Sequence, residues 1–127
     1  MKKFATWAIV AAVAASAAPA TNAQPKSVAG NVEAGRTLAL WACTACHIVA
    51  ADQRFKPIYT GTPHPPDFNA IANKPGITAA SLQHHLESLP DVPKDSLMAN
   101  PDLTSDETRD VVAFIISLRD KPAAPAQ

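Results

Sequence analysis

Apolar residues recur at helical spacing in three separate segments of the chain, which predicts three amphipathic helices. The first helix is expected over residues 32–42 with Asn31 as its N-cap, and the second over residues 78–88. The third helix begins at Thr104, which is placed to form a capping box with Glu107. Its buried face is expected to comprise Val111, Phe114, Ile115 and Leu118.

The segments between these helices are irregular and rich in proline. Residues 50–67 are interrupted repeatedly by proline and glycine, which predicts a long loop, and ordered loops of this length in small domains usually serve a function. A short helix is expected over residues 68–73, closed by Pro75 and Gly76, before a second irregular stretch at 90–101. No segment predicts a strand and the chain has no internal repeat, so we expect an all-α domain.

The N-terminus has the pattern of an export signal. Lys2 and Lys3 precede an apolar run of roughly 15 residues, and the small residues Thr21 and Ala23 suit cleavage after Ala23. A membrane-spanning helix needs about 20 apolar residues, so we expect cleavage, a periplasmic location and no stable membrane insertion afterwards. The expected segments are a signal peptide at 1–23, a flexible leader at 24–30, a folded domain at 31–120 and a flexible tail at 121–127.

Charge and cysteine content narrow the possible functions. The full chain has 11 basic and 11 acidic residues, and loss of Lys2 and Lys3 with the signal leaves a net charge of −2. This balance argues against a nucleic-acid partner, because phosphate recognition usually needs a basic surplus. Two cysteines cannot form a multi-disulfide scaffold or a four-cysteine zinc site.

The strongest chemical motif is the run Cys43-Thr44-Ala45-Cys46-His47. Two thiols three positions apart can add across the two vinyl groups of one haem, and the histidine that follows then lies under the iron. The motif therefore predicts one covalently attached haem c, held by Cys43 and Cys46 and ligated by His47.

Three other interpretations of the cysteine pair are possible. A thioredoxin-like redox pair would require strands in a βαβ arrangement, which the sequence does not predict. A zinc site would need its remaining ligands from His64, His84 and His85. A structural disulfide between Cys43 and Cys46 is compatible with an exported protein.

With these motifs in order, the chain resembles the class I monohaem cytochromes c over residues 31–118. Gly35 lies eight residues before Cys43, the haem motif follows, Met98 precedes the last helix, and that helix carries Phe114. The resemblance implies an all-α cytochrome c fold, with three to five helices wrapped around one haem. It also implies that the first and last helices cross at Gly35, and that Phe114 faces the first helix.

The resemblance further implies an axial ligand pair of His47 and Met98. A thioether is a soft, neutral ligand that favours ferrous iron and raises the reduction potential. His64 in the proline-rich loop is the rival distal ligand. His84 and His85 lie about 100° apart on a helix and cannot both face the iron, so we expect them in solvent.

Other residues are expected around the haem. Pro66 resembles the family proline whose carbonyl accepts a hydrogen bond from the ligating histidine, with Pro65 as an equal structural rival. Phe68 is expected in the haem pocket, together with Ile71, Leu82 and Leu86. Trp41 and Tyr59 either donate hydrogen bonds to a haem propionate or simply pack in the interior.

Two positions depart from the family pattern. Ala39 stands where the family usually has an aromatic residue, so Leu40 or Trp41 is expected to fill the space at a looser helix crossing. Ala99 stands where many relatives have a proline directly after the methionine ligand.

The residues and the resemblance together predict a periplasmic electron carrier and not an enzyme, although it could be the cytochrome subunit of a dehydrogenase complex. With both axial positions filled, the iron exchanges single electrons with redox partner proteins, such as a dehydrogenase or a terminal oxidase or reductase. The alternative is a haem-based domain that binds or senses small ligands, in which Met98 is labile.

Overall fold

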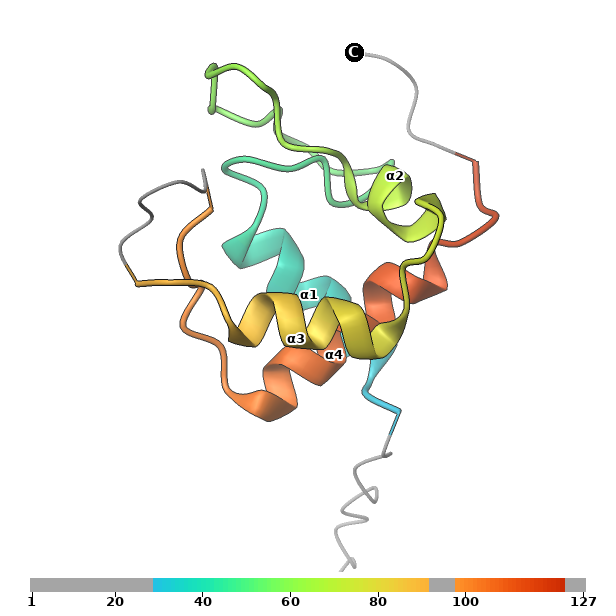
Figure 1. Cartoon of the computed structure of the whole chain (residues 1–127). Helices are drawn as coiled ribbons and strands as arrows, with labels where there is room; N and C mark the ends of the chain where they lie inside the picture. Colours follow the sequence, from blue (N-terminus) through green and yellow to red (C-terminus); the bar gives the residue numbers. More distant parts are fainter. Residues whose placement is uncertain (1–28, 92–97, 123–127) are drawn as a thin grey trace, which may run out of the picture.

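The computed structural model describes residues 29–91 and 98–122, and all the regular structure in these two ranges is helical (Figure 1). The helices are α1 (Val32–Ala42), α2 (Phe68–Asn73), α3 (Ala79–Glu87) and α4 (Ser105–Ser117). The predicted all-α fold is confirmed, and each expected helix is present. The expected signal peptide at 1–23, most of the leader and residues 123–127 of the tail lie outside the described ranges.

Side-chain caps explain where the helices begin. The Asn31 side chain accepts hydrogen bonds from the backbone N–H groups of Glu33 and Ala34, both at 3.0 Å. At the start of α4, Glu107 Oε2 accepts from Thr104 N at 2.8 Å, while Thr104 Oγ1 accepts from Glu107 N at 3.3 Å. These contacts satisfy amide groups that a helix start leaves unpaired, and they confirm the predicted N-cap and capping box.

Helices α1 and α4 cross in direct backbone contact at Gly35. A Cβ atom at Gly35 would overlap the carbonyl oxygen of Asp110, so only glycine permits this approach. Gly30, which has a φ of +75°, packs in the same way against the carbonyl of Arg109. The predicted crossing at Gly35 is therefore confirmed, and the expectation of a looser crossing is wrong.

Of the two residues expected to fill the space beside Ala39, Leu40 packs against the core and Trp41 does not. Ala39 is fully buried, and Leu40 packs partly buried against the core, but the Trp41 side chain is 83% exposed. The backbone of Asp110 lies opposite Gly35. Phe114 lies one turn further along α4 and packs against Phe68 of α2, with ring centroids 6.3 Å apart.

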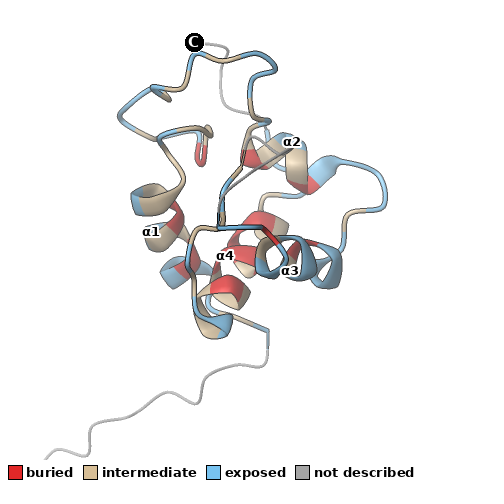
Figure 2. Cartoon of the chain, turned by 60° about the vertical axis from the view of Figure 1, so that its left-hand side comes forward, coloured by how far each residue is buried: buried red, intermediate tan, exposed pale blue. Residues whose placement is uncertain are grey.

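The core lies where the inner faces of the helices meet, as the red segments of Figure 2 show. Of the described helices, α1 and α3 each pack on α4, but α1 does not contact α3. The core cluster consists of Ala39, Val49, Ala50, Phe68, Ala72, Leu82, Val111, Val112, Phe114 and Ile115. The predicted buried face of α4 is largely confirmed, with Leu118 only partly buried.

Long-range hydrogen bonds join α2 to the end of α4. Arg119 donates from Nε to the carbonyl of Ala72 at 3.1 Å and from Nη2 to the carbonyl of Ile77 at 2.9 Å. Asn69 Nδ2 donates to the carbonyl of Lys121 at 2.9 Å. These contacts hold α2, and the segment after it, against the end of the C-terminal helix.

Within 29–91 and 98–122, no helix is both long enough and apolar enough to cross a membrane.

Candidate functional site

The site begins where α1 ends and the chain turns through the cysteine motif. Cys43 closes the helix by donating its N–H to the carbonyl of Ala39 at 2.9 Å. The N–H groups of Cys46 and His47 then both point to the Cys43 carbonyl, at 3.2 and 2.9 Å. This tight turn presents the two cysteines and His47 within five residues at the C-terminal end of α1.

The His47 ring is held by the backbone of the proline-rich loop. Its Nδ1 lies 2.7 Å from the carbonyl oxygen of Pro66, so the contact predicted for Pro66 is present and Pro65 does not make it. Since a carbonyl can only accept, Nδ1 carries a proton, and in the neutral ring the lone pair is then on Nε2. That is the tautomer in which a histidine ligates a metal, and the carbonyl makes it a more basic ligand.

Aromatic packing and one backbone hydrogen bond fix the position of the loop that carries Pro66. The Phe68 N–H donates to the Ile48 carbonyl at 2.9 Å, which ties the start of α2 to the residue after His47. The rings of His47 and Phe68 are tilted by 56° with centroids 5.5 Å apart. The Phe68 ring also packs against Phe114, so Phe68 links His47 to the core.

The apolar residues expected near the haem belong to the same core as Phe68 or pack against it. Leu82 is buried, while Ile71 and Leu86 are partly buried and pack against the same core. Together with Phe68 they give an apolar surrounding, which lowers the local dielectric constant around any group bound there.

Both cysteines are free thiols in the described structure and are half-buried. Burial, followed by the neighbouring Cys46, raises the pKa of the Cys43 thiol to about 11. A thiol with this pKa stays protonated at neutral pH, and the thiolate is the nucleophile of thiol–disulfide exchange. This environment therefore does not favour use of Cys43 in redox exchange.

Gln53, for which the sequence predicts no role, shapes the long loop. Gln53 Oε1 accepts from Val49 N at 2.6 Å, and its Nε2 donates to the Phe55 carbonyl at 2.7 Å. Further on, the N–H groups of Ile58 and Tyr59 both donate to the carbonyl of Ala45, at 3.0 and 3.1 Å. The loop therefore folds back over the cysteine turn. No sequence signal marks these contacts, because glutamine is common in solvent-exposed loops.

Met98 lies half-buried in the segment that leads to α4. Hydrogen bonds of Asn100 hold this segment: its N–H donates to the Pro90 carbonyl at 3.0 Å, and its Nδ2 donates to Asp91 Oδ1 at 3.2 Å. The Asn100 Oδ1 atom accepts a hydrogen bond from Asp102 N at 2.9 Å. These hydrogen bonds of Asn100, two residues after Met98, therefore link the chain after residue 97 to the chain before residue 92.

The remaining candidates lie at the surface or partly buried. His64, His84 and His85 are exposed, as predicted for the two histidines of α3. Tyr59 is half-buried, with its hydroxyl in the space that a side chain on Gly61 would need. The interpretation of Trp41 as a packed interior residue is wrong, because its side chain is 83% exposed.

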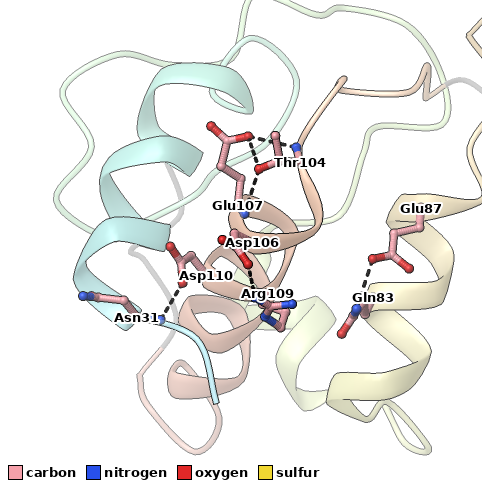
Figure 3. A network of polar contacts seen from close by, with 8 residues as sticks. All are labelled: Asn31, Gln83, Glu87, Thr104, Asp106, Glu107, Arg109 and Asp110. Carbon is pink, nitrogen blue, oxygen red and sulfur yellow. Dashed lines mark hydrogen bonds and ion pairs between the residues drawn. The ribbon is translucent and has the colours of Figure 1, made fainter. Parts of the chain in front are cut away.

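Charged pairs in the described residues join α1 to the long loop and lie along α4. Arg36 Nη2 lies 2.7 Å from Asp52 Oδ2, which joins α1 to the loop after His47. The hydrogen bond from Arg36 lowers the pKa of the Asp52 carboxyl below its ordinary value. On α4, Arg109 pairs with Asp106, and Figure 3 shows this pair beside the capping box.

These residues fit covalently bound haem. A tight turn carries two unpaired thiols at the spacing of the haem vinyl groups, followed by a histidine whose Nε2 is available to iron. The surrounding apolar side chains suit a large hydrophobic macrocycle.

An all-α fold built around this turn defines a haem-binding electron-transfer protein. The family model described as Cytochrome c matches residues 32–119, so the chain belongs to the cytochrome c family and carries covalently bound haem c. Comparisons with curated proteins and with solved structures gave no match.

Proposed function

We propose that this protein is a periplasmic carrier of single electrons with one haem c attached through Cys43 and Cys46. In this proposal His47 and Met98 are the axial ligands, and the protein passes electrons between redox partner proteins. When bound, the haem supplies a one-electron ferric–ferrous couple, and the protein supplies ligation, burial and a docking surface.

The observation that carries the proposal is the 2.7 Å contact between His47 Nδ1 and the Pro66 carbonyl, directly beside two unpaired thiols. A histidine oriented in this way is typical of a metal ligand. Met98 is half-buried, and Asn100 ties its segment to Pro90 and Asp91 after α3, which supports its assignment as the second ligand.

The side chains of the site have different roles in this proposal. The Pro66 carbonyl fixes the ring orientation of His47 by accepting a hydrogen bond at Nδ1, which leaves Nε2 as the nitrogen that would bind iron. Phe68, Leu82 and the neighbouring apolar residues exclude water, which reduces the reorganisation that a change of charge would otherwise require. Two filled axial positions leave no open site for substrate, which favours electron transfer over catalysis.

The test is to express the full precursor in a periplasm that has haem-attachment machinery. We expect a protein whose haem survives denaturation and acid extraction, and a Cys43→Ser, Cys46→Ser double variant that loses it. His47→Ala should impair attachment or folding. A normal low-spin protein from His47→Ala would contradict the ligand assignment, and a haem-free native protein would contradict the whole proposal.

A further inference from the structure

A shallow groove of about 550 Å³ runs between the exposed faces of α1 and α4. Its floor includes Ala34 and Leu38, and Trp41 lies at the end nearest the cysteine turn. The groove is distinct from the interior that holds His47, because neither His47 nor the cysteines line it.

The charged side chains that line the groove are all acidic: Glu33, Glu107 and Asp110. Two of them are held by contacts shown in Figure 3. Asp110 Oδ1 accepts from Asn31 N at 2.7 Å, and the Glu107 carboxylate caps α4.

Among the described residues, Arg36 pairs with Asp52 and Arg109 with Asp106, and neither arginine lines the groove. The groove thus combines an apolar floor with a fixed negative rim.

Trp41 is the residue of this groove that lies closest in sequence to the cysteine turn. Its side chain is 83% exposed, although a large aromatic residue of a small domain is usually buried. It lies two residues before Cys43, in the last turn of α1. Exposed tryptophans are frequent energetic centres of protein interfaces, and the indole face attracts lysine and arginine cations.

We propose that the groove between α1 and α4 is the docking site for a redox partner protein that presents lysine or arginine side chains around an apolar contact, with electrons passing beside Trp41. The occupant follows from charge complementarity: the rim supplies negative charge, and the floor and Trp41 supply apolar area. This inference rests on the proposed electron-carrier function and names the class of partner.

The experiment uses the haem-loaded full protein and two small one-electron oxidants of opposite charge. Tris(phenanthroline)cobalt(III) is an aromatic cation, and cobalt(III)–EDTA is an anion. In each reaction the ferrous haem loses one electron to Co(III), which gives ferric haem and Co(II). Stopped-flow absorption at about 10 mM ionic strength measures the second-order rate constants, because screening is weak there.

The charge variants are Glu33→Lys in the groove and Glu87→Lys on α3, a matched control on a helix that does not contact α1. We expect Glu33→Lys to slow the cationic oxidant roughly three- to tenfold and to accelerate the anionic one. Glu33→Gln should have a smaller effect in the same direction. Glu87→Lys should change either rate by less than about twofold.

A second pair of variants tests the aromatic contact. Trp41→Ala should slow the cationic aromatic oxidant, while Phe55→Ala, which removes a 78% exposed aromatic residue elsewhere, should not. Equal effects within each matched pair would overturn the docking site, even though the haem spectrum stays normal. Absence of haem from the unaltered protein would overturn the proposed function, and the docking site with it.

Discussion

At the scale of single residues, the hydrogen bond from His47 to Pro66 is the feature on which the account depends. The histidine and its partner are 19 positions apart, yet both were predicted, because the Cys-x-x-Cys-His motif and the resemblance to class I cytochromes c identify them. Trp41 was not predicted correctly. Its exposure depends on which way the last turn of α1 faces, and a tryptophan in an apolar stretch gives no signal of that.

Met98→Ala tests the distal ligand. We expect the haem to remain attached, the reduction potential to fall, and the vacated position to bind carbon monoxide, because alanine cannot replace the thioether. Absorption spectra with and without carbon monoxide, and a redox titration, measure these changes. His64→Ala is the control, since it removes the rival ligand. An unchanged spectrum and potential in Met98→Ala would show that another residue ligates the iron.

The Arg36–Asp52 pair predicts a pH-dependent contribution to stability. The folded pKa of Asp52 is lowered, so the pair stabilises the fold above the ordinary carboxyl pKa, and this contribution disappears as pH falls through the folded value. Asp52→Asn should therefore lower the thermal midpoint slightly at pH 7, with a difference that shrinks below about pH 4.

Asp120→Asn is the matched control for Asp52→Asn, because it removes an exposed carboxylate just after α4. A difference between Asp52→Asn and the unaltered protein that grows on acidification would contradict the predicted role of the pair.

At the scale of helices, the caps allowed the bounds to be predicted closely. Asn31, Thr78 and Thr104 each accept a hydrogen bond from an amide of the first turn. Local contacts of this kind depend on residues two or three positions apart, so a sequence displays them directly. The close approach of α1 to α4 was indicated by Gly35, whereas the similar contact of Gly30 follows only from the position of Arg109 in space.

Gly35→Ala should destabilise the protein by about 2–3 kcal/mol, because the added methyl group meets backbone atoms of Asp110 that cannot rotate away. Gly76→Ala is the control: Gly76 has a φ of +81° and no neighbour near an added Cβ, so only backbone strain of about 1 kcal/mol is expected. Denaturant unfolding of the two haem-loaded variants gives the free energies. A smaller loss for Gly35→Ala than for Gly76→Ala would contradict the tight crossing.

Thr104→Ala should cost about 1 kcal/mol of unfolding free energy, because it removes the acceptor for Glu107 N and half of the capping box. Ser105→Ala changes the neighbouring exposed hydroxyl and should stay within about 0.5 kcal/mol of the unaltered protein. Equal losses in the two variants, measured in the same denaturant series, would show that the capping box does not stabilise α4.

At the scale of the whole molecule, the sequence predicted the fold class and the motif but not how the long loop is arranged. The Gln53 side chain and the Ala45 carbonyl organise residues 50–67 by hydrogen bonds to backbone groups. Every residue type has these backbone groups, so no sequence pattern indicates the contacts. The links from Arg119 to the segment after α2 span more than 40 positions and likewise depend on the completed fold. Tertiary contacts of this kind can be stated only once the helices are placed.

The central claim is one haem c with His47 and Met98 as axial ligands in an electron carrier. The most direct measurement is the absorption spectrum of the oxidised and reduced holoprotein, extended into the near infrared. We expect a low-spin c-type spectrum, a weak near-infrared methionine–iron band, and no change with carbon monoxide. A high-spin spectrum that shifts with carbon monoxide would contradict it and would favour a ligand-binding or sensing haem domain.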